Sequence, residues 1–130
     1  MPETATRERP EPIDPRAAKR AFFRIMDAWG VGDHEARVLL GAPSRSTFYN
    51  YKRGEGGVPS ADTLERISYV LGIYKALQLL FPNPAQADAW MRKPNRAFGD
   101  RSALEHVLGG KVVDLASVRG YLDGVRGQGL

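Results

Sequence analysis

Residues 36–53 read ARVLLGAPSRSTFYNYKR, and this stretch decides the predicted fold. Its first half is an apolar helical segment that ends at Gly41, where a tight turn follows. Its second half, residues 44–53, predicts another helix in which Phe48 and Tyr51 point inward. Two short helices joined by a tight turn are the arrangement of a helix-turn-helix, which offers the outer face of its second helix to a DNA groove.

The outer face of this second predicted helix is polar and basic. Arginine and asparagine side chains there are able to contact base edges, while serine, threonine and lysine side chains are able to hold phosphates. The predicted DNA-binding residues are Ser44, Arg45, Ser46, Thr47, Tyr49, Asn50, Lys52 and Arg53. The pattern leaves one alternative open, which is a plain helical hairpin with a solvated basic face.

Amphipathic patterns predict a helix on each side of this unit. Upstream, a helix over residues 15–29 ends at Gly30, and Asp33 is expected to cap the first helix of the helix-turn-helix. Downstream, a long helix begins after Ser60 and is expected to kink near Gly72. Its predicted buried seam consists of Leu64, Ile67, Leu71, Tyr74 and Phe81.

The last third of the chain predicts shorter helices and no β-sheet, because nothing in it alternates with a period of two. A helix restarts at Pro84, and Ser102 with Glu105 has the spacing of a capping box. Asp114 is expected to cap the last helix, with Val113 stapled onto the turn that follows. The apolar positions of that helix are Leu115, Val118, Leu122 and Val125.

The composition predicts a globular protein that does not cross a membrane. Of 130 residues, 42% are hydrophobic and 26% are charged, and no apolar run approaches the length of a bilayer span or a signal peptide. We therefore expect a cytoplasmic protein. The absence of cysteine excludes disulfides and thiolate catalysis, and the net charge of +4 favours an anionic partner.

The predicted segments are a disordered tail over residues 1–14, a helix-turn-helix domain over residues 15–81 and a C-terminal module over residues 82–130.

Residues 90–102 read WMRKPNRAFGDRS and carry the most specific signal in the chain. This run resembles the W-L-x-x-P-N-x-x-L/F-x-G/D-R-x-P segment of the Xre/MbcA/ParS antitoxin family, and the resemblance extends over roughly residues 17–125. It implies an all-α fold in which an Xre-like helix-turn-helix precedes a small helical toxin-binding domain. It also implies a partner, a RES-domain toxin that consumes NAD or transfers ADP-ribose from it, whose active-site cleft the C-terminal part of the antitoxin covers.

Large rigid side chains and arginines cluster in this run and in the glycine-rich last helix. Aromatic side chains form contacts at low entropic cost, and arginines are able to pair with carboxylates of a partner. The predicted toxin-binding residues are Trp90, Arg92, Pro94, Asn95, Arg96, Phe98, Arg101, Tyr121, Leu122, Asp123 and Arg126. Two alternatives stay open: Trp90 and Phe98 complete the core while the arginines cap carbonyl groups, and Asn95 only forms a turn.

No residue pattern predicts an active site, a cofactor or a metal site. His34 is expected on the surface, and His106 lies beside Glu105 without a recognisable nucleophile. The resemblance implies an antitoxin that is not an enzyme, acts as a homodimer within a toxin–antitoxin complex and represses its own promoter by binding operator DNA. The long middle helix and the C-terminal module are the expected dimer contacts. The alternatives are a stand-alone transcriptional repressor whose C-terminal half only dimerises, and an enzyme in its own right.

Overall fold

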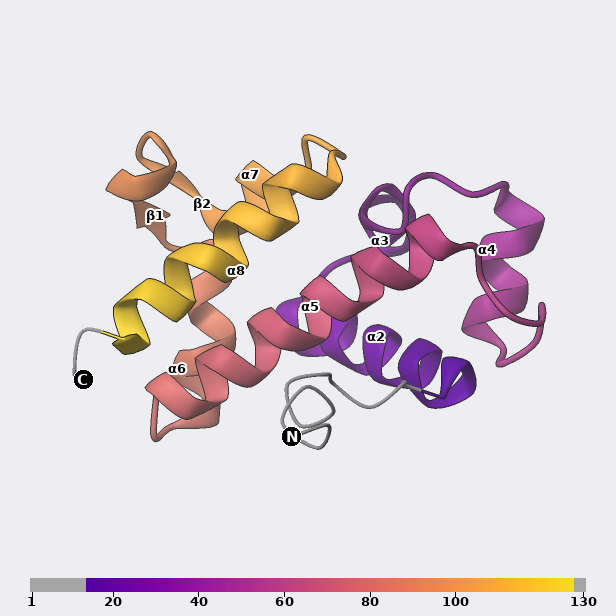
Figure 1. Cartoon of the computed structure of the whole chain (residues 1–130), viewed down its shortest axis with the longest axis horizontal. Helices are drawn as coiled ribbons and strands as arrows, with labels where there is room; N and C mark the ends of the chain where they lie inside the picture. The colour runs from indigo at the N-terminus through magenta and orange to yellow at the C-terminus, as the bar shows by residue number, and fades with distance from the viewer. Residues whose placement is uncertain (1–13, 128–130) are drawn as a thin grey trace, which may run out of the picture.

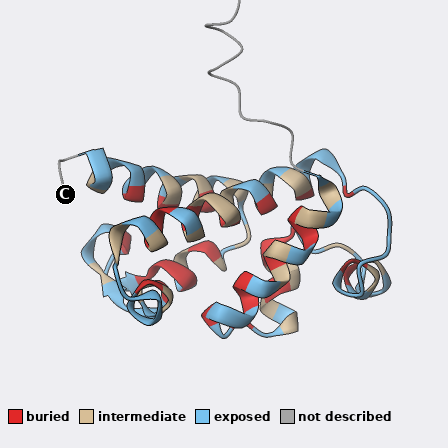
Figure 2. Ribbon diagram, turned by 90° about the horizontal axis from the view of Figure 1, so that it is seen from below, coloured by how far each residue is buried: buried red, intermediate tan, exposed pale blue. Residues whose placement is uncertain are grey.

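The longest helix, α5 (Ala61–Leu80), runs through the middle of the molecule in a computed structural model that describes residues 14–127 (Figure 1). It packs most extensively against α8 (Val112–Gly127) and then against α2 (Pro15–Trp29). One residue from each of these helices, Phe22, Val70 and Val118, is completely buried in the same apolar cluster. The N-terminal and C-terminal helices therefore share a single hydrophobic core, and their outward sides carry the exposed residues (Figure 2).

The first helix, α2, begins and ends at residues suited to those positions. Asp14 accepts a hydrogen bond from the backbone N–H of Arg16 (3.2 Å), and Gly30 ends the helix in a left-handed conformation, φ 69°. α3 (Asp33–Leu39) and α4 (Arg45–Lys52) follow. The predicted cap at Asp33 is wrong, because Gly32 occupies the N-cap and Asp33 is the first helical residue. The remainder of the predicted tail, residues 1–13, lies outside the described residues.

The buried side of α5 differs from the predicted seam. Only Ile67 of that seam is fully buried, whereas the others are half-buried. The reason is that α2 and α8 cover two sides of α5, so its buried face is wider than one seam and is turned away from the predicted one. They are Thr63, Ile67, Val70, Ile73, Ala76 and Leu77. The predicted kink at Gly72 is also absent from this continuous helix, and the glycine instead leaves room for Arg119, whose Nη1 lies 1.5 Å from where a Cβ would stand.

The C-terminal part consists of short elements followed by α8. They are α6 (Pro84–Ala89), the 3-10 helix η1 (Trp90–Arg92), β1 (Pro94–Asn95), the 3-10 helix η2 (Arg96–Phe98), β2 (Arg101–Ser102) and α7 (Ala103–Val107). The antiparallel pair of β1 and β2, in which Pro94 faces Ser102, corrects the prediction that no strand is present. Strands of two residues are too short to show an alternating pattern in the sequence.

The start of α8 also differs from the prediction. The helix begins at Val112, so Asp114 lies within its first turn and does not precede it. Val113 is 61% exposed and does not form the predicted staple. Leu115, Val118 and Leu122 are buried as the helical spacing predicts, because they lie on the side of α8 that faces the core.

Candidate functional site

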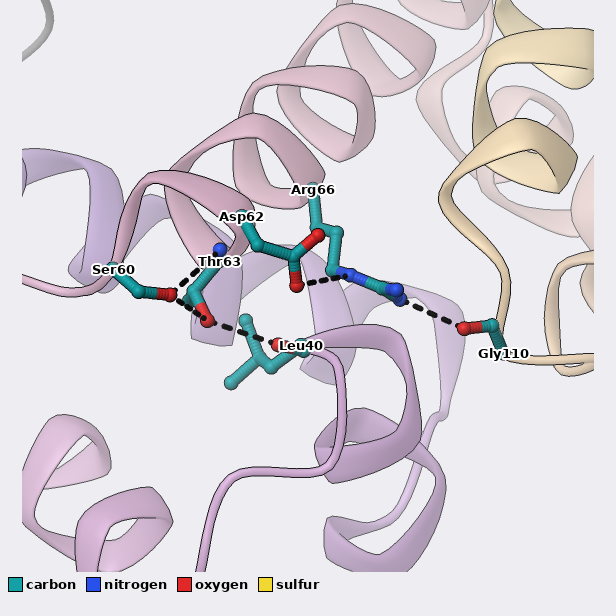
Figure 3. A network of polar contacts seen from close by, with 6 residues as sticks. All are labelled: Leu40, Ser60, Asp62, Thr63, Arg66 and Gly110. Carbon is teal, nitrogen blue, oxygen red and sulfur yellow. Dashed lines mark hydrogen bonds and ion pairs between the residues drawn. The ribbon is translucent and has the colours of Figure 1, made fainter.

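The turn between α3 and α4 is fixed to the start of α5 (Figure 3). Gly41 (φ 91°) and Ala42 (φ 59°) both adopt left-handed conformations, which reverse the chain within two residues. The hydroxyl group of Thr63 donates to the carbonyl oxygen of Leu40 (3.1 Å). A Cβ on Gly41 would lie 2.9 Å from a carboxylate oxygen of Asp62. These contacts set the direction in which α4 leaves the turn.

α4 begins at a serine cap and packs through its aromatic side. Ser44 Oγ accepts a hydrogen bond from the backbone N–H of Thr47 (3.2 Å). Phe48 and Tyr51 are buried, and the ring of Phe48 meets that of Phe23 in α2 edge-on, at 5.5 Å between centroids. Because these aromatic residues point into the protein, the opposite face of α4 is turned to solvent.

A buried lysine that no sequence pattern predicted holds the loop that follows α4. Lys19 of α2 is 2% exposed, and its Nζ donates to the carbonyl oxygens of Glu55 (2.9 Å) and Gly57 (2.8 Å). Its charge also lies 5.1 Å from the ring centroid of Tyr51. Burial, with a smaller effect from Arg16, lowers the pKa of Lys19. A lysine in an amphipathic helix gives no sign in the sequence that loop carbonyls will cover it.

The structure places most of the predicted DNA-binding residues together on the outer face of α4. The exposed ones are Ser44, Arg45, Ser46, Tyr49, Lys52 and Arg53. Asn50 is half-buried and accepts a hydrogen bond from Arg53 Nη2. Lys52 Nζ bonds Asp33 Oδ1 (2.7 Å), and this bond raises the pKa of Lys52. Thr47 is half-buried beside the cap. DNA contact by these residues stays a prediction.

The loop of the C-terminal module is closed by its own side chains. Asn95 Oδ1 accepts from the backbone N–H of Ala97 (2.8 Å), and the Asn95 carbonyl accepts from the N–H of Asp100 (3.0 Å). Asn95 is therefore a turn-forming residue. At the end of the loop Ser102 and Glu105 form the predicted capping box, whose backbone and side-chain hydrogen bonds from Ser102 lower the pKa of Glu105. Pro94 lies exposed on the surface of this loop.

Four ring side chains, which we call the aromatic cluster, join this loop to α7 and α8. The ring centroids of Trp90 and Tyr121 are 6.2 Å apart in a stacked arrangement. The ring of Phe98 lies 5.5 Å from that of Tyr121 and stacks on His106 at 5.0 Å. Phe98 is 9% exposed and completes the core, Trp90 is half-buried, and Tyr121 remains 37% exposed. Tyr121 is thus the aromatic residue of the cluster that solvent reaches most.

The predicted arginines have different environments. Arg92 donates from Nε to the carbonyl oxygen of Trp29 (3.0 Å) and from Nη2 to that of Gly30 (2.6 Å), so it ties the module to the end of α2. Arg101 Nη2 donates to the carbonyl oxygen of Glu105 (2.8 Å). Arg96 is exposed, and its side chain makes no hydrogen bond or ion pair within residues 14–127. Arg92 therefore has a structural role that the prediction of partner contact did not include.

The prediction for α8 needs one correction. Leu122 is 1% exposed and belongs to the core, so it is not available to a partner. Asp123 is exposed and accepts hydrogen bonds from Arg119 Nε at 3.1 and 3.0 Å. Arg126 is also exposed, with its Nη1 3.9 Å from Asp123. The spacing of a helix explains the correction, because neighbouring residues such as Tyr121 and Leu122 point about 100° apart.

A second arginine connects the two halves of the chain and was not predicted (Figure 3). Arg66 donates from Nε to Asp62 (3.0 Å) and from Nη1 to the carbonyl oxygen of Gly110 (2.9 Å). Gly110 precedes α8, whereas Asp62 lies against Gly41 in the helix-turn-helix. Arg66 and Gly110 are 44 positions apart in the chain, and no local pattern predicts contacts at that separation.

The histidine in the aromatic cluster contacts a serine of α8. His106 Nε2 lies 2.9 Å from Ser117 Oγ, and the Ser117 hydroxyl donates to the carbonyl oxygen of Asp114 (3.0 Å). Within residues 14–127, no three histidine or acidic side chains are grouped to hold a metal ion. In the same part of the chain, no helix is both long and apolar enough to cross a membrane.

Comparison with known proteins gives two family matches. Residues 8–72 match the family model of the antitoxin Xre-like helix-turn-helix domain, and residues 76–127 match that of the antitoxin Xre/MbcA/ParS C-terminal toxin-binding domain. A relative, the uncharacterized protein y4oB of Sinorhizobium fredii, is 49% identical over 111 residues, which cover 85% of each chain. The chain has an all-α fold in which a helix-turn-helix precedes a toxin-binding domain, and these are the domains of a regulator. It belongs to the Xre/MbcA/ParS-type antitoxins.

Proposed function

We propose that this antitoxin neutralises a RES-domain toxin, an enzyme that consumes NAD or transfers ADP-ribose from it, by covering the toxin's active site. The observation that carries the proposal is the exposed Tyr121 at the edge of the aromatic cluster, inside the domain that matches the toxin-binding family. Tyr121 is held by Trp90 and Phe98 on its inner side. An aromatic side chain that is already fixed loses little entropy when a partner covers it, which is a property of binding hot spots.

Exposed basic side chains lie on the loop and on α8, the two elements that carry this cluster, and they fit a partner with acidic groups near its catalytic cleft. Lys93, Arg96 and Arg126 are exposed. Only Arg126 of these lies within 4 Å of a carboxylate in the described part of the chain, and that contact is 3.9 Å long. Guanidinium groups form two parallel hydrogen bonds with a carboxylate, so Arg96 is well suited to grip one on the toxin.

The shape of α8 supports entry into a narrow cleft. The helix is formed as far as Gly127, so a partner would not need to order it, which avoids a cost of about 1–2 kcal/mol per residue. Gly120 and Gly124 are exposed, and a Cβ at either position would meet nothing within 4 Å. The helix is therefore narrow on the side of these two glycines. Tyr121 and Asp123 lie next to the glycines in the sequence, and both are exposed to a partner that enters there.

The test is the NAD turnover of a purified RES-domain toxin with and without the full-length chain. We expect wild-type protein to abolish turnover and Tyr121→Ala to weaken the complex by about 2 kcal/mol, or roughly thirtyfold in Kd. Tyr49→Ala is the matched control, because Tyr49 is similarly exposed (42%) but lies on α4. Undiminished turnover in the presence of wild-type protein, or equal inhibition by Tyr121→Ala and wild type, would contradict the proposal.

We also propose that the outer face of α4 binds operator DNA and represses the antitoxin's own promoter. Arg45, Ser46, Tyr49 and Arg53 are exposed on that face, and the turn before it is fixed to α5. Arg45→Ala should weaken binding of the promoter fragment by about 1–3 kcal/mol and leave toxin inhibition unchanged. Arg24→Ala on α2 is the control. A stand-alone repressor would instead bind the operator tightly and leave the toxin active.

A further inference from the structure

The two helices of the helix-turn-helix enclose a small hollow on the surface, which we call the α3–α4 hollow. It has a volume of about 140 Å³, and α4 lies at the opposite end of the molecule from α6 (Figure 1). The lining residues are Asp33, His34 and Arg37 of α3, and Arg45, Phe48 and Tyr49 of α4. Part of the surface that carries the proposed DNA-binding residues is therefore concave.

Positive charge dominates the lining of the α3–α4 hollow. The carboxylate of Asp33 is already bonded by Lys52 Nζ at 2.7 Å. Among the described residues, no carboxylate lies within 4 Å of the guanidinium groups of Arg37 and Arg45. His34 is exposed and has no acidic partner in that part of the chain either. Two arginines and a histidine that no carboxylate neutralises favour an anion in the hollow.

The fold holds two of the polar groups of the hollow in place. Arg37 Nε donates to the carbonyl oxygen of Pro43 in the turn, and this is the one side-chain hydrogen bond of Arg37 within residues 14–127. The other N–H groups of its guanidinium are donors for a ligand. The ring of Tyr49 packs edge-on against that of the buried Phe48, at 5.2 Å between centroids. Arg37 and Tyr49 therefore lose little side-chain freedom when an anion binds.

We propose that the α3–α4 hollow binds a phosphodiester group of the DNA backbone, with Arg37 and Arg45 as its main ligands and His34 as a third. The inference rests on the proposed binding of DNA by α4, and it adds two residues of α3 to that surface. Phosphate oxygens accept charge-assisted hydrogen bonds from guanidinium groups, which are among the stronger hydrogen bonds in proteins.

The position of the hollow favours a backbone phosphate over a free phosphate ion. Arg45 and Tyr49 line the hollow and also belong to the exposed face of α4, so the two surfaces are continuous. A phosphodiester group held here fixes the position of α4 on the duplex, which is the usual part of phosphate contacts in protein–DNA complexes. Contacts of this kind carry no sequence information, so the hollow should act equally on every duplex that α4 meets.

The histidine makes this contact depend on pH. Histidine gains a positive charge as the pH falls from about 8 to about 6, and that charge attracts a phosphodiester group. The charged and titratable groups around His34 are Asp33, Glu35 and Arg37 of α3, Arg45, Tyr49 and Lys52 of α4, and Asp27 of α2. Carboxylates, lysines and arginines ordinarily keep their charge over this range, and tyrosine stays neutral. DNA binding should therefore tighten in mild acid.

DNA binding at two pH values tests the role of His34. Fluorescence anisotropy with the full-length protein should give a Kd for the promoter fragment that is about threefold to tenfold lower at about pH 6 than at about pH 8. His34→Gln should remove most of this difference, and His34→Arg should bind tightly at both pH values because its charge is permanent. Gln86→Arg, which adds a charge at an exposed position of α6, should keep the wild-type pH dependence.

The two arginines are tested by the dependence of binding on sequence and on salt. Arg37→Gln/Arg45→Ala should weaken binding to the promoter fragment and to an unrelated duplex by the same factor, about tenfold or more, and should reduce the slope of log Kd against log salt by about 1. Arg20→Ala/Arg24→Ala, which loses the same charge at exposed positions of α2, should leave both affinities within about twofold of wild type.

The controls separate this inference from the proposed operator binding. Circular dichroism checks that the variants are folded, and the exposed Arg45→Ala alone keeps the test open if loss of the bond to Pro43 unfolds the double variant. Equal wild-type Kd values at both pH values, or arginine variants that bind both duplexes like wild type, would overturn the inference; the second result is also expected of a hollow that takes only free phosphate. Failure of operator recognition differs, because wild type would then bind both duplexes equally while the arginine variants still weakened both. A wild-type protein that binds neither duplex would contradict both proposals.

Discussion

The turn of the helix-turn-helix (residues 40–44) and the loop of the C-terminal module (residues 93–102) are built from similar parts but are held differently. Each has a glycine and then a non-glycine residue in the left-handed region, and each ends at a serine that caps the next helix. The corresponding residues are Gly41 and Gly99, Ala42 and Asp100, and Ser44 and Ser102. The turn is bonded to α5, whereas the loop closes on itself through Asn95 and the short β pair.

This difference decides what each region presents to a partner. A turn bonded to a neighbouring helix fixes the direction of the helix that follows, and the outer face of α4 then follows from helical periodicity. A loop closed on itself presents its own side chains. Because its backbone is irregular, their directions do not follow the periodicity of a helix or a strand. Neighbouring residues in the C-terminal module therefore divide between core and surface in ways that only the structure reveals.

The largest effect should come from two adjacent residues of α8. Leu122→Ala removes a buried side chain and should lower the free energy of unfolding by about 2–4 kcal/mol. Tyr121→Ala should lower it by less than about 1 kcal/mol while reducing toxin inhibition. Urea denaturation and the NAD-turnover assay measure the two properties. A Leu122→Ala protein with wild-type stability and no toxin binding would return Leu122 to the partner surface.

Two arginines of the loop should differ next. Arg92→Ala removes two hydrogen bonds to the end of α2 and should destabilise the protein by about 1–3 kcal/mol. Arg96→Ala should change stability by less than about 0.5 kcal/mol, because Arg96 is exposed. Thermal unfolding of both variants provides the comparison. Equal stability of the two variants would show that the hydrogen bonds between the module and α2 contribute nothing to the free energy of unfolding.

The two serine caps allow the turn and the loop to be compared with the same substitution. Ser102→Ala disrupts a complete capping box and should lower the free energy of unfolding by about 1–2 kcal/mol, whereas Ser44→Ala at an exposed cap should lower it by about 0.5–1 kcal/mol.

The pKa of Glu105 is lowered in the folded protein, so the stability that its carboxylate contributes is present above the ordinary value of 4.5 and is lost as the pH falls through the folded pKa. Urea titrations at neutral and acidic pH should show that Glu105→Gln reduces this acid dependence.

The smallest effects concern the left-handed residues. Ala42→Gly should stabilise the protein by about 0.5–1 kcal/mol, because alanine at φ 59° is strained and glycine is not. Asp100→Gly, at φ 65°, should change stability by less than about 0.5 kcal/mol, because aspartate tolerates this conformation better than alanine. Differential scanning calorimetry is sensitive enough for this pair. A destabilised Ala42→Gly protein would mean that the flexibility gained by the unfolded chain outweighs the relief of strain.

The sequence alone predicted the features that depend on local pattern. The helix over residues 15–29, and the inward position of Phe48 and Tyr51, were confirmed because a helix with one apolar stripe buries that stripe. The capping box at Ser102 was confirmed because both of its hydrogen bonds lie within four residues. The resemblance carried by residues 90–102 predicted the family that the comparisons show.

The side-chain contacts that it missed join distant segments. Lys19 is buried by loop carbonyls 36 and 38 positions away, and Arg92 bonds carbonyls 63 and 62 positions away. Arg119 of α8 fills the space beside Gly72. This glycine, which predicted a kink in α5, is therefore a point of close packing between α5 and α8. Periodicity reports which side of a helix is apolar, but it does not report which neighbour covers it.

The bridge made by Arg66 has a consequence for domain exchange in this protein. A single guanidinium group links the helix-turn-helix, through Asp62, to the backbone before the last helix, through Gly110. A chimaera that joined this helix-turn-helix to the toxin-binding domain of another antitoxin would need a carbonyl group in the same place. The fit between the two halves therefore depends on a joint formed by one guanidinium group, and a well-matched graft would preserve it first.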